Sequence, residues 1–173
     1  MQIRRAQRDD LLQIRTIYNA AKAYMDISGN PNQWPEGYPP EDYLRQDIEL
    51  SRLYVCEEDG ILHGVFMFSV MDDPTYHRID GAWLNAESYG VIHRIASDGI
   101  VKGIFREVLE FCKTKLAEQN IKNLRIDTHA DNKTMQHLVE KYGFVPCGII
   151  YLENGSPRCA YQLVSASDFT VKS

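Results

Sequence analysis

The sequence predicts a protein of the α/β class, with elements in the order β-α-α-β-β-β-α-β-α-β-β. Stretches with apolar residues at helical spacing alternate along the chain with short apolar runs that are typical of strands. Two pairs of such runs enclose turn signals, at residues 57–60 and at Asn154-Gly155. Residues 91–112 predict a short strand, a loop with two glycines and a helix.

Length and composition predict one domain that covers residues 1–173. Apolar residues make up 44% of the chain and charged residues 25%, as in ordinary globular proteins. The net charge of −5 and the pI of about 5.5 argue against a nucleic-acid binder, which would carry a basic field. The sequence has no run of about 18 apolar residues and no apolar signal core, so we expect a cytoplasmic protein without a membrane span.

The cysteines and histidines lack the spacing of metal or redox motifs. Neither CxxC nor HExxH occurs, so we expect no metal site. Each cysteine lies in an apolar pattern, which predicts buried free thiols at Cys56, Cys112, Cys147 and Cys159.

The N-terminal region predicts an edge strand at residues 2–5 and a first helix. The helix begins near Asp9 or Asp10, since acidic side chains favour the positive end of the helix dipole, and it ends near residues 28–31. Its apolar face is formed at i+3 and i+4 spacing by Leu11, Ile14, Tyr18, Ala21 and Met25.

Residues 30–40 predict a loop, because prolines and a glycine exclude regular structure there. The loop carries Trp34 and Tyr38, which form either a binding wall or a plug at the rim of the core. Residues 40–49 then predict a short second helix, with proline and acids in its first turn.

An antiparallel hairpin is predicted from strands at residues 53–56 and 61–70. Residues 72–84 follow as an insertion rich in Tyr, His, Asp and Trp. It is either a substrate wall across one end of the sheet or a plain surface excursion.

The stretch from residue 91 to 112 has the pattern of a phosphate site. A helix that starts on a glycine loop presents unpaired N–H groups and partial positive charge, and Lys102 adds a full charge. The same junction also occurs in proteins without a ligand, so a purely structural role is the alternative.

The C-terminal part predicts a strand, a short helix and a hairpin. The strand covers residues 123–129, and the helix is capped by Asp131-Asn132 and ended by Gly143. Strands at residues 144–152 and 158–164 complete the chain.

Two local motifs resemble those of the GNAT superfamily of acyl-CoA-dependent N-acyltransferases. The first is His93-Arg-Ile-Ala-Ser97 followed by Lys102-Gly-Ile-Phe-Arg-Glu-Val-Leu109, which resembles the family's central strand, pyrophosphate loop and following helix. The second, Thr128-His-Ala-Asp-Asn132 to Glu140-Lys-Tyr-Gly-Phe144, resembles a second family helix. The resemblance covers almost the whole chain. It implies a GNAT-like fold with a mixed, mostly antiparallel sheet of about six or seven strands, flanked by about four helices.

The resemblance implies acetyl-CoA as co-substrate and no metal. In this family the central strand and its neighbour splay apart around the pantetheine arm. The implied cofactor-binding positions are Ile95, Ala96, Ser97, Val101, Lys102, Gly103, Ile104, Phe105 and Asn132. Asn132 has a second interpretation as a plain N-cap, and it can serve both purposes.

The chain departs from the family pattern at three positions. With Gly103 on the central glycine, Ile100 replaces the usual Arg or Gln, and Phe105 replaces a small residue. Backbone N–H groups bind phosphate through conformation, so we expect a cradle formed mainly by backbone, with Ser97 and Lys102 as contributing side chains. Val139 replaces the tyrosine that reprotonates the leaving thiolate in many relatives. Tyr142, three residues further on, is a candidate acid but not the matching residue, so either another group or water protonates the CoA sulfur, or turnover is slow or absent.

Acetyl transfer needs a neutral amine, and His93 is the candidate base, acting through water. Strand alternation predicts that Val91, His93 and Ile95 share one face, and histidine ordinarily titrates near neutral pH. The alternative is a packed histidine that hydrogen-bonds to the backbone. Direct attack needs no covalent enzyme intermediate, so no cysteine nucleophile is required.

The predicted function is transfer of the acetyl group of acetyl-CoA to a primary amine of a small molecule or peptide, by a monomer or homodimer. Candidate substrate-binding residues are Trp34, Tyr38, Tyr76 and Trp83, and Asp80 and Glu87 are placed to attract a cationic amine. One alternative is a catalytically weak acyl-CoA-binding sensor of the same fold, suggested by Val139 and Phe105. Another is an unrelated phosphate- or nucleotide-binding α/β module.

Overall fold

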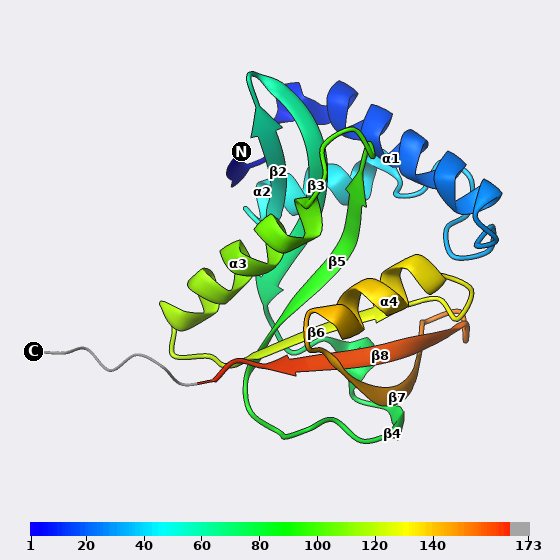
Figure 1. Cartoon of the computed structure of the whole chain (residues 1–173), viewed down its shortest axis with the longest axis vertical. Coiled ribbons are helices and arrows are strands. Elements are labelled where there is room, and N and C mark those ends of the chain that lie inside the picture. Colours follow the sequence, from blue (N-terminus) through cyan, green and yellow to red (C-terminus); the bar gives the residue numbers. More distant parts are fainter. Residues whose placement is uncertain (167–173) are drawn as a thin grey trace, which may run out of the picture.

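The structure, a computed structural model, describes residues 1–166 as a single twisted sheet with helices on both faces (Figure 1). The strands are β1 (Gln2–Arg5), β2 (Leu53–Glu58), β3 (Ile61–Val70), β4 (Ile79–Gly81), β5 (Tyr89–Ser97), β6 (Asn123–Thr128), β7 (Val145–Tyr151) and β8 (Pro157–Val164). The helices are α1 (Leu11–Ile27), α2 (Glu41–Glu49), α3 (Ile104–Ala117) and α4 (Lys133–Lys141), with single 3-10 turns at Arg8–Asp10 and Pro74–Tyr76.

The eight strands follow the spatial order β1-β2-β3-β5-β6-β8-β7-β4. Every neighbouring pair is antiparallel except β5 and β6, which run parallel. The predicted fold class, four helices and the edge position of β1 are therefore confirmed.

The sheet has one strand more than expected, because part of the predicted insertion forms β4. This strand pairs with β7 at the far edge of the sheet, where Gly81 lies opposite Gly148. The two backbones approach so closely that a Cβ built at Gly81 would lie 2.2 Å from the carbonyl oxygen of Cys147. Three residues with a glycine carry no readable strand period, which is why the sequence does not reveal this strand.

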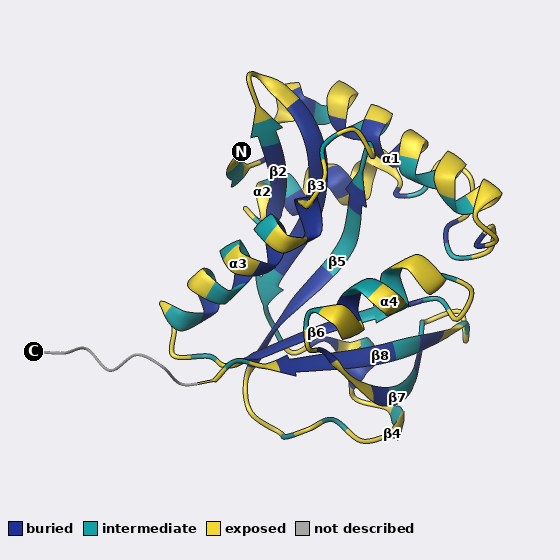
Figure 2. Cartoon of the chain, viewed as in Figure 1, coloured by how far each residue is buried: buried dark blue, intermediate teal, exposed yellow. Residues whose placement is uncertain are grey.

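The two faces of the sheet carry separate cores. Helices α1 and α2 bury residues such as Ile14 and Leu44 against one face, and α3 and α4 bury residues such as Leu109 and Val139 against the other. Figure 2 shows the strands mostly buried and each helix exposed on its outer side only. Helical spacing of apolar residues produces this one-sided burial.

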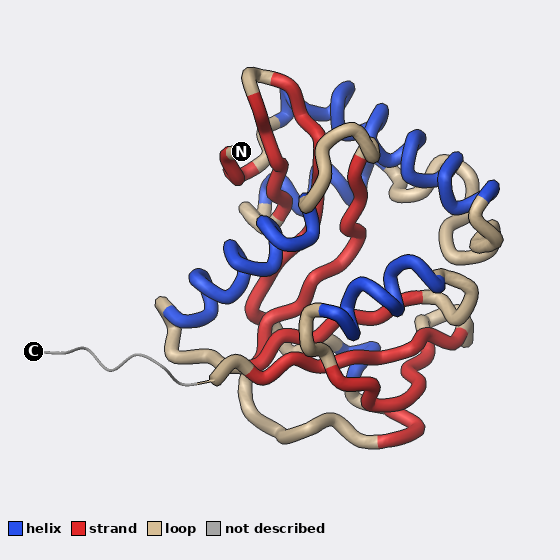
Figure 3. Tube along the Cα trace, in the orientation of Figure 1, coloured by secondary structure: helices blue, strands red, loops and turns tan. Residues whose placement is uncertain are grey.

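The parallel strands β5 and β6 separate soon after they start. Their pairing is confined to residues 89–91 against 123–125. Beyond this point β5 follows β3 and β6 follows β8, and Figure 3 shows the two strands diverging. The splayed pair that the family resemblance implies is present, and it leaves the edges of both strands free to face a ligand.

A β-bulge in β5 overturns the prediction that His93 and Ile95 share a face. Arg94 has a φ of +51°, and the register with β3 shifts at this point. Val91 packs in the core on the α1 side, whereas Ile95 packs against the core on the α3 side. An extra residue in one strand reverses the alternation that follows it.

All four cysteines are free thiols, and Cys56, Cys112 and Cys147 are buried as predicted, whereas Cys159 is half-buried. Burial raises the pKa of Cys56 to about 12. Within residues 1–166, no helix is long and apolar enough to cross a membrane. The same residues contain no group of three or more His, Cys, Asp or Glu side chains placed to hold a metal ion.

Candidate active site

Two cavities lie beside β5, the first between β5 and β6 and the second between the end of β5, α1 and α4. The first has a volume of about 470 Å³ and the second about 450 Å³. Both are lined by Met25, Ile95, Asn132 and Met135, so they meet at the middle of β5 and the start of α4. A molecule in one cavity can therefore reach a molecule in the other at this junction.

The second cavity contains most of the residues predicted to bind the cofactor. It extends from α1 past the end of β5 and the glycine loop to α4. Its lining includes Ile95, Ala96, Ser97, Lys102, Ile104, Phe105 and Asn132. Val101 and Gly103 lie in the same loop, outside this lining.

The loop before α3 presents backbone N–H groups to this cavity. Gly103 precedes the helix with a φ of +82°, a left-handed conformation that glycine adopts without strain. The first backbone hydrogen bond of the helix runs from the N–H of Glu107 to the carbonyl of Gly103, at 3.2 Å. The N–H groups of residues 104–106 consequently have no partner inside the helix, and they suit an anion such as a phosphate.

A histidine on β3 braces this loop, which the sequence did not reveal. His63 Nδ1 lies 2.7 Å from Asp98 Oδ2, and the N–H of Ile100 donates to Asp98 Oδ1 at 2.9 Å. The N–H of Asp98 donates in turn to the carbonyl of His63. The shape of the loop therefore depends on a residue far away in the sequence as well as on its glycines.

Phe105 and Tyr142 pack against each other, with ring centroids 5.6 Å apart. Phe105 is buried, and Tyr142 lies outside the lining of both cavities. Val139 is fully buried in the core on the α3 side. The position of Tyr142 gives no support to its candidate role as the acid.

His93 lies between two carboxylates in the first cavity. Its Nε2 is 2.6 Å from Asp73 Oδ2, and its Nδ1 is 3.7 Å from Asp127 Oδ2. The hydroxyl of Tyr76 donates to the same oxygen of Asp127 at 2.7 Å. The hydrogen-bond partner of His93 is therefore the carboxylate of Asp73. It is not a backbone group, which the alternative interpretation of a packed histidine required.

Asp73 is ionised at neutral pH. Burial pushes the pKa of its carboxyl upward, but the hydrogen bond and charge of His93 and two hydrogen bonds from Thr75 outweigh burial and bring the pKa to about 2. A carboxylate at Nε2 holds the proton of a neutral imidazole on that nitrogen. Nδ1 then carries the lone pair and can accept a proton from a molecule in the cavity.

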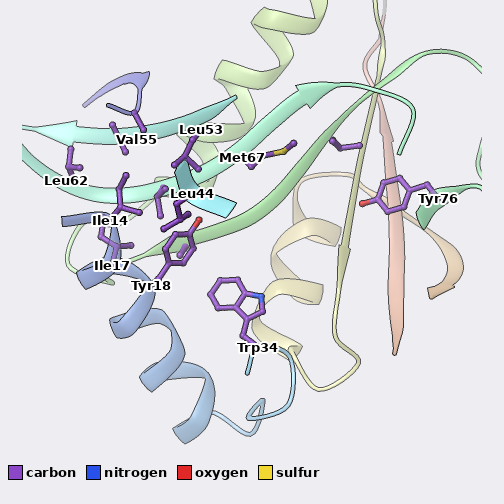
Figure 4. Close-up of a cluster of buried hydrophobic side chains, with 14 of the residues drawn as sticks. Ile14, Ile17, Tyr18, Trp34, Leu44, Leu53, Val55, Leu62, Met67 and Tyr76 are labelled. Carbon is purple, nitrogen blue, oxygen red and sulfur yellow. The ribbon is translucent and has the colours of Figure 1, made fainter. Parts of the chain in front are cut away.

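Trp34 and Tyr38 line the first cavity, while Tyr76 and Trp83 lie behind it. Trp34 is also part of the core, where Figure 4 shows it next to Tyr18 and well separated from Tyr76. Trp34 thus packs in the core and also lines the first cavity. The Trp83 indole donates to the carbonyl of Tyr76, whose hydroxyl donates to Asp127.

The acidic groups of the cavity differ from the expected ones. Asp80 accepts a hydrogen bond from the hydroxyl of Tyr151, and Glu87 lies near Asn123, both outside the cavity lining. The carboxylates that line the cavity are Asp73 and Asp127. Asp73 immediately precedes the 3-10 turn, and Asp127 lies near the end of β6, where polar residues alternate with Leu124 and Ile126. Neither position carries a motif that would reveal from the sequence that it lines the cavity.

Hydrogen bonds of Gln33 connect the loop at residues 30–38 to α4 and β8 beside the first cavity. The Gln33 side-chain oxygen accepts from Asn132 Nδ2 at 2.8 Å, and the Gln33 carbonyl accepts from Arg158 at 3.1 Å. Asn132 Oδ1 accepts from the N–H of Met135 at 3.0 Å, which confirms the predicted N-cap. One side chain thus caps α4 and holds the loop.

Comparison with known proteins agrees with this architecture. A model of the acetyltransferase (GNAT) family matches residues 14–144. The crystal structure of a GNAT-family acetyltransferase from Streptococcus agalactiae 2603 is 31% identical over 95% of each chain, with a TM-score of 0.81.

Two more distant structures share the fold. A GNAT-family acetyltransferase from Listeria monocytogenes 4b F2365 is 21% identical over 94% of each chain, with a TM-score of 0.70. The ribosomal-protein-S18-alanine N-acetyltransferase from Escherichia coli is 17% identical, over 98% of this chain and 97% of that one, with a TM-score of 0.64. No sequence among curated proteins matches the chain.

Proposed function

The chain belongs to the GNAT acetyltransferase family, and on this premise we propose that it transfers the acetyl group of acetyl-CoA to a primary amine of a small molecule or peptide. The observation that carries the proposal is the meeting of the two cavities at Ile95 and Asn132. One cavity offers backbone N–H groups suited to phosphates, and the other offers an Asp-His pair suited to an amine.

The residues of the second cavity fit the co-substrate. The free N–H groups at the start of α3, with Ser97 and Lys102, would hold the pyrophosphate, and the free edge of β5 at residues 95–97 would hold the pantetheine arm. Bound acetyl-CoA would supply the activated acyl group at the junction. An N–H of β5 would donate to the acyl oxygen, as an oxyanion hole does.

His93 would act as the base. Its Nδ1 would take a proton from the acceptor ammonium through a water molecule, while Asp73 stabilises the imidazolium that forms. The neutral amine nitrogen would then form a bond to the acyl carbon as the carbon–sulfur bond breaks, and it would lose a second proton as the amide forms. Because Tyr142 lies outside both cavities, we assign the transfer of this proton to the leaving thiolate to a water relay.

The test compares two histidines that each lie beside an aspartate. His93→Gln should lower kcat/KM about 100-fold. His77→Gln is the matched control, because His77 is exposed and pairs with Asp72 outside the cavities. Stabilisation of His93→Gln by acetyl-CoA in a thermal shift assay should equal that of the wild type. Unchanged turnover of His93→Gln across pH would exclude the base role.

A second candidate is an acyl-CoA-binding protein with little turnover, favoured by the buried Val139 where relatives carry a tyrosine. Thermal stabilisation by CoA without thiol release from any amine would support it. Stabilisation by ATP, with no effect of CoA or acetyl-CoA, would instead support a phosphate-binding module and exclude both CoA functions.

A further inference from the structure

Arg158, at the start of β8, brings a positive charge into the first cavity without an acidic partner. Its side chain is buried, with 6% of the residue exposed, and it lines the cavity. Its hydrogen bonds go to neutral oxygens: Nη1 to Ser156 Oγ at 2.6 Å and to the carbonyl of Pro157 at 2.8 Å, and Nη2 to the carbonyl of Gln33 at 3.1 Å. No carboxylate of residues 1–166 lies within ion-pair distance of it.

The other two arginines that line the first cavity have an acidic partner. Arg94 and Arg52 share the carboxylate of Asp47. Arg125 lies between two aromatic rings, with its guanidinium 4.1 Å from the centroid of Trp83, and it lies outside the lining of the first cavity. A buried charge is costly unless it is paired, so Arg158 is the position in the cavity where an anionic group gains most.

The groups that accept hydrogen bonds from Arg158 also fix the orientation of its guanidinium. Three fixed acceptors surround its planar guanidinium, including the carbonyl of Gln33 in the loop that crosses the cavity. Burial lowers the pKa of Arg158 from its ordinary value, although the charge of Asp127 acts in the opposite direction. A preorganised guanidinium binds a carboxylate through two parallel hydrogen bonds.

The same cavity also carries negative charge, at Asp127 and at the Asp-His pair. It therefore presents carboxylates and a guanidinium without a carboxylate partner to a single small molecule. Its volume of about 470 Å³ suits a ligand of amino-acid size.

We infer that the acceptor is an amino acid, or a similar small amine that carries a carboxylate, with the carboxylate on Arg158 and the amino group beside His93 and Asp127. This inference rests on the proposed acetyl transfer and specifies its acceptor. Arg158 is then a specificity-determining residue, and the loop at Gln33 contributes by holding it.

The experiment compares L-amino acids with their amides as acceptors, using release of the CoA thiol. The amide has the less basic amino group, so a larger fraction of it is neutral and reactive. A preference for the acid therefore cannot arise from amine basicity. We expect the wild type to use the preferred acid at least about tenfold better than its amide in kcat/KM.

Arg158→Gln should remove most of this preference, chiefly through a higher KM for the acid, and leave kcat/KM for the amide within about threefold. Arg8→Gln is the control, because Arg8 is exposed, pairs with Glu49 and lies outside the cavities. Should Arg158→Gln fail to fold, the ratio of acid to amide in the wild type still decides the question.

Equal or better use of the amides by the wild type would overturn the inference while leaving acetyl transfer intact. An equal loss for acid and amide in Arg158→Gln would also overturn it, since that result marks a structural role. Stabilisation by acetyl-CoA without turnover of any acid would overturn it as well. Absence of stabilisation by either acetyl-CoA or CoA would overturn the proposed function itself, and the inference with it.

Discussion

Asp73 is the side chain on which the orientation of His93 depends. Its carboxylate lies against the imidazole and accepts hydrogen bonds from the N–H and the hydroxyl of Thr75. Its own N–H donates to the hydroxyl of Tyr89 at 2.9 Å. These contacts fix the position of the Asp73 carboxylate. The His93 imidazole, which is hydrogen-bonded to it, is fixed as well.

Asp73→Asn should destabilise the protein in a manner that depends on pH. The pKa of Asp73 is lowered from its ordinary value of 3.8 to about 2, so its carboxylate stabilises the fold at pH values above about 4. That contribution, about 2 kcal/mol, is lost as the pH falls through about 2. Urea unfolding should therefore show the full difference from wild type at about pH 5, and a shrinking difference below about pH 4.

Asp72→Asn is the matched control, since the neighbouring carboxylate is 75% exposed. Its effect should stay below about 0.5 kcal/mol at every pH. A loss for Asp73→Asn that is equally large at pH 3 and at pH 7 would show that packing, and not the charge of Asp73, is responsible.

At the scale of elements, strand β5 is held by an ion pair with α2. The bulge at Arg94 turns its guanidinium toward Asp47, which also accepts from Arg52 Nε at 2.8 Å. On the α1 side, the hydroxyl of Tyr18 donates to the carbonyl of Arg94 at 2.7 Å. Two helices thus fix the point at which β5 leaves regular pairing and reaches the junction of the cavities.

Asp47→Asn should lower the free energy of unfolding by about 3 kcal/mol, because it leaves two arginines without a carboxylate in a site where Asp47 is 1% exposed. Glu49→Gln on the same helix is the control, because Glu49 is exposed and pairs only with Arg8, and its loss should stay below about 0.5 kcal/mol. Urea denaturation measures both. Equal losses for the two variants would contradict a structural role for the buried pairs.

At the scale of the whole molecule, two halves of the sheet meet at a narrow joint. Only three residue pairs connect β5 with β6, and Gly90 lies opposite Leu124 in the middle of them. A Cβ built at Gly90 would lie 2.8 Å from both Leu116 Cδ2 and Phe68 Cε2. Leu116 of α3 and Phe68 of β3 can therefore pack directly against the paired residues of β5 and β6, because Gly90 has no side chain.

Gly90→Ala should destabilise the whole protein by about 2 kcal/mol, since the added methyl group displaces packed side chains. Ser69→Ala is the control on the adjacent strand, opposite Val91, and it adds no atom to the packing. The free energy of unfolding from urea denaturation measures both. A loss below about 0.5 kcal/mol for Gly90→Ala would mean that the joint has more room than its distances indicate.

Elements with local signals were predictable from the sequence. Asn132 caps α4, Gly143 follows its last turn with a φ of +89°, and the turn at Gly155 joins β7 to β8. Helix caps and tight turns depend on residues a few positions apart, so their chemistry is visible along the chain. Most of the predicted cofactor-binding residues line the second cavity, and Val101 and Gly103 lie in the same loop outside its lining.

Contacts between distant residues decided the rest. His93 with Asp73, His63 with Asp98, and Arg158 with Gln33 are separated by 20, 35 and 125 residues. No local pattern specifies such pairs, because folding alone brings them together. The bulge at Arg94 and the edge strand β4 likewise depend on register with other strands. The sequence by itself determined most of the order of elements and the glycine loop before α3, whereas tertiary packing determined the charges that line the first cavity.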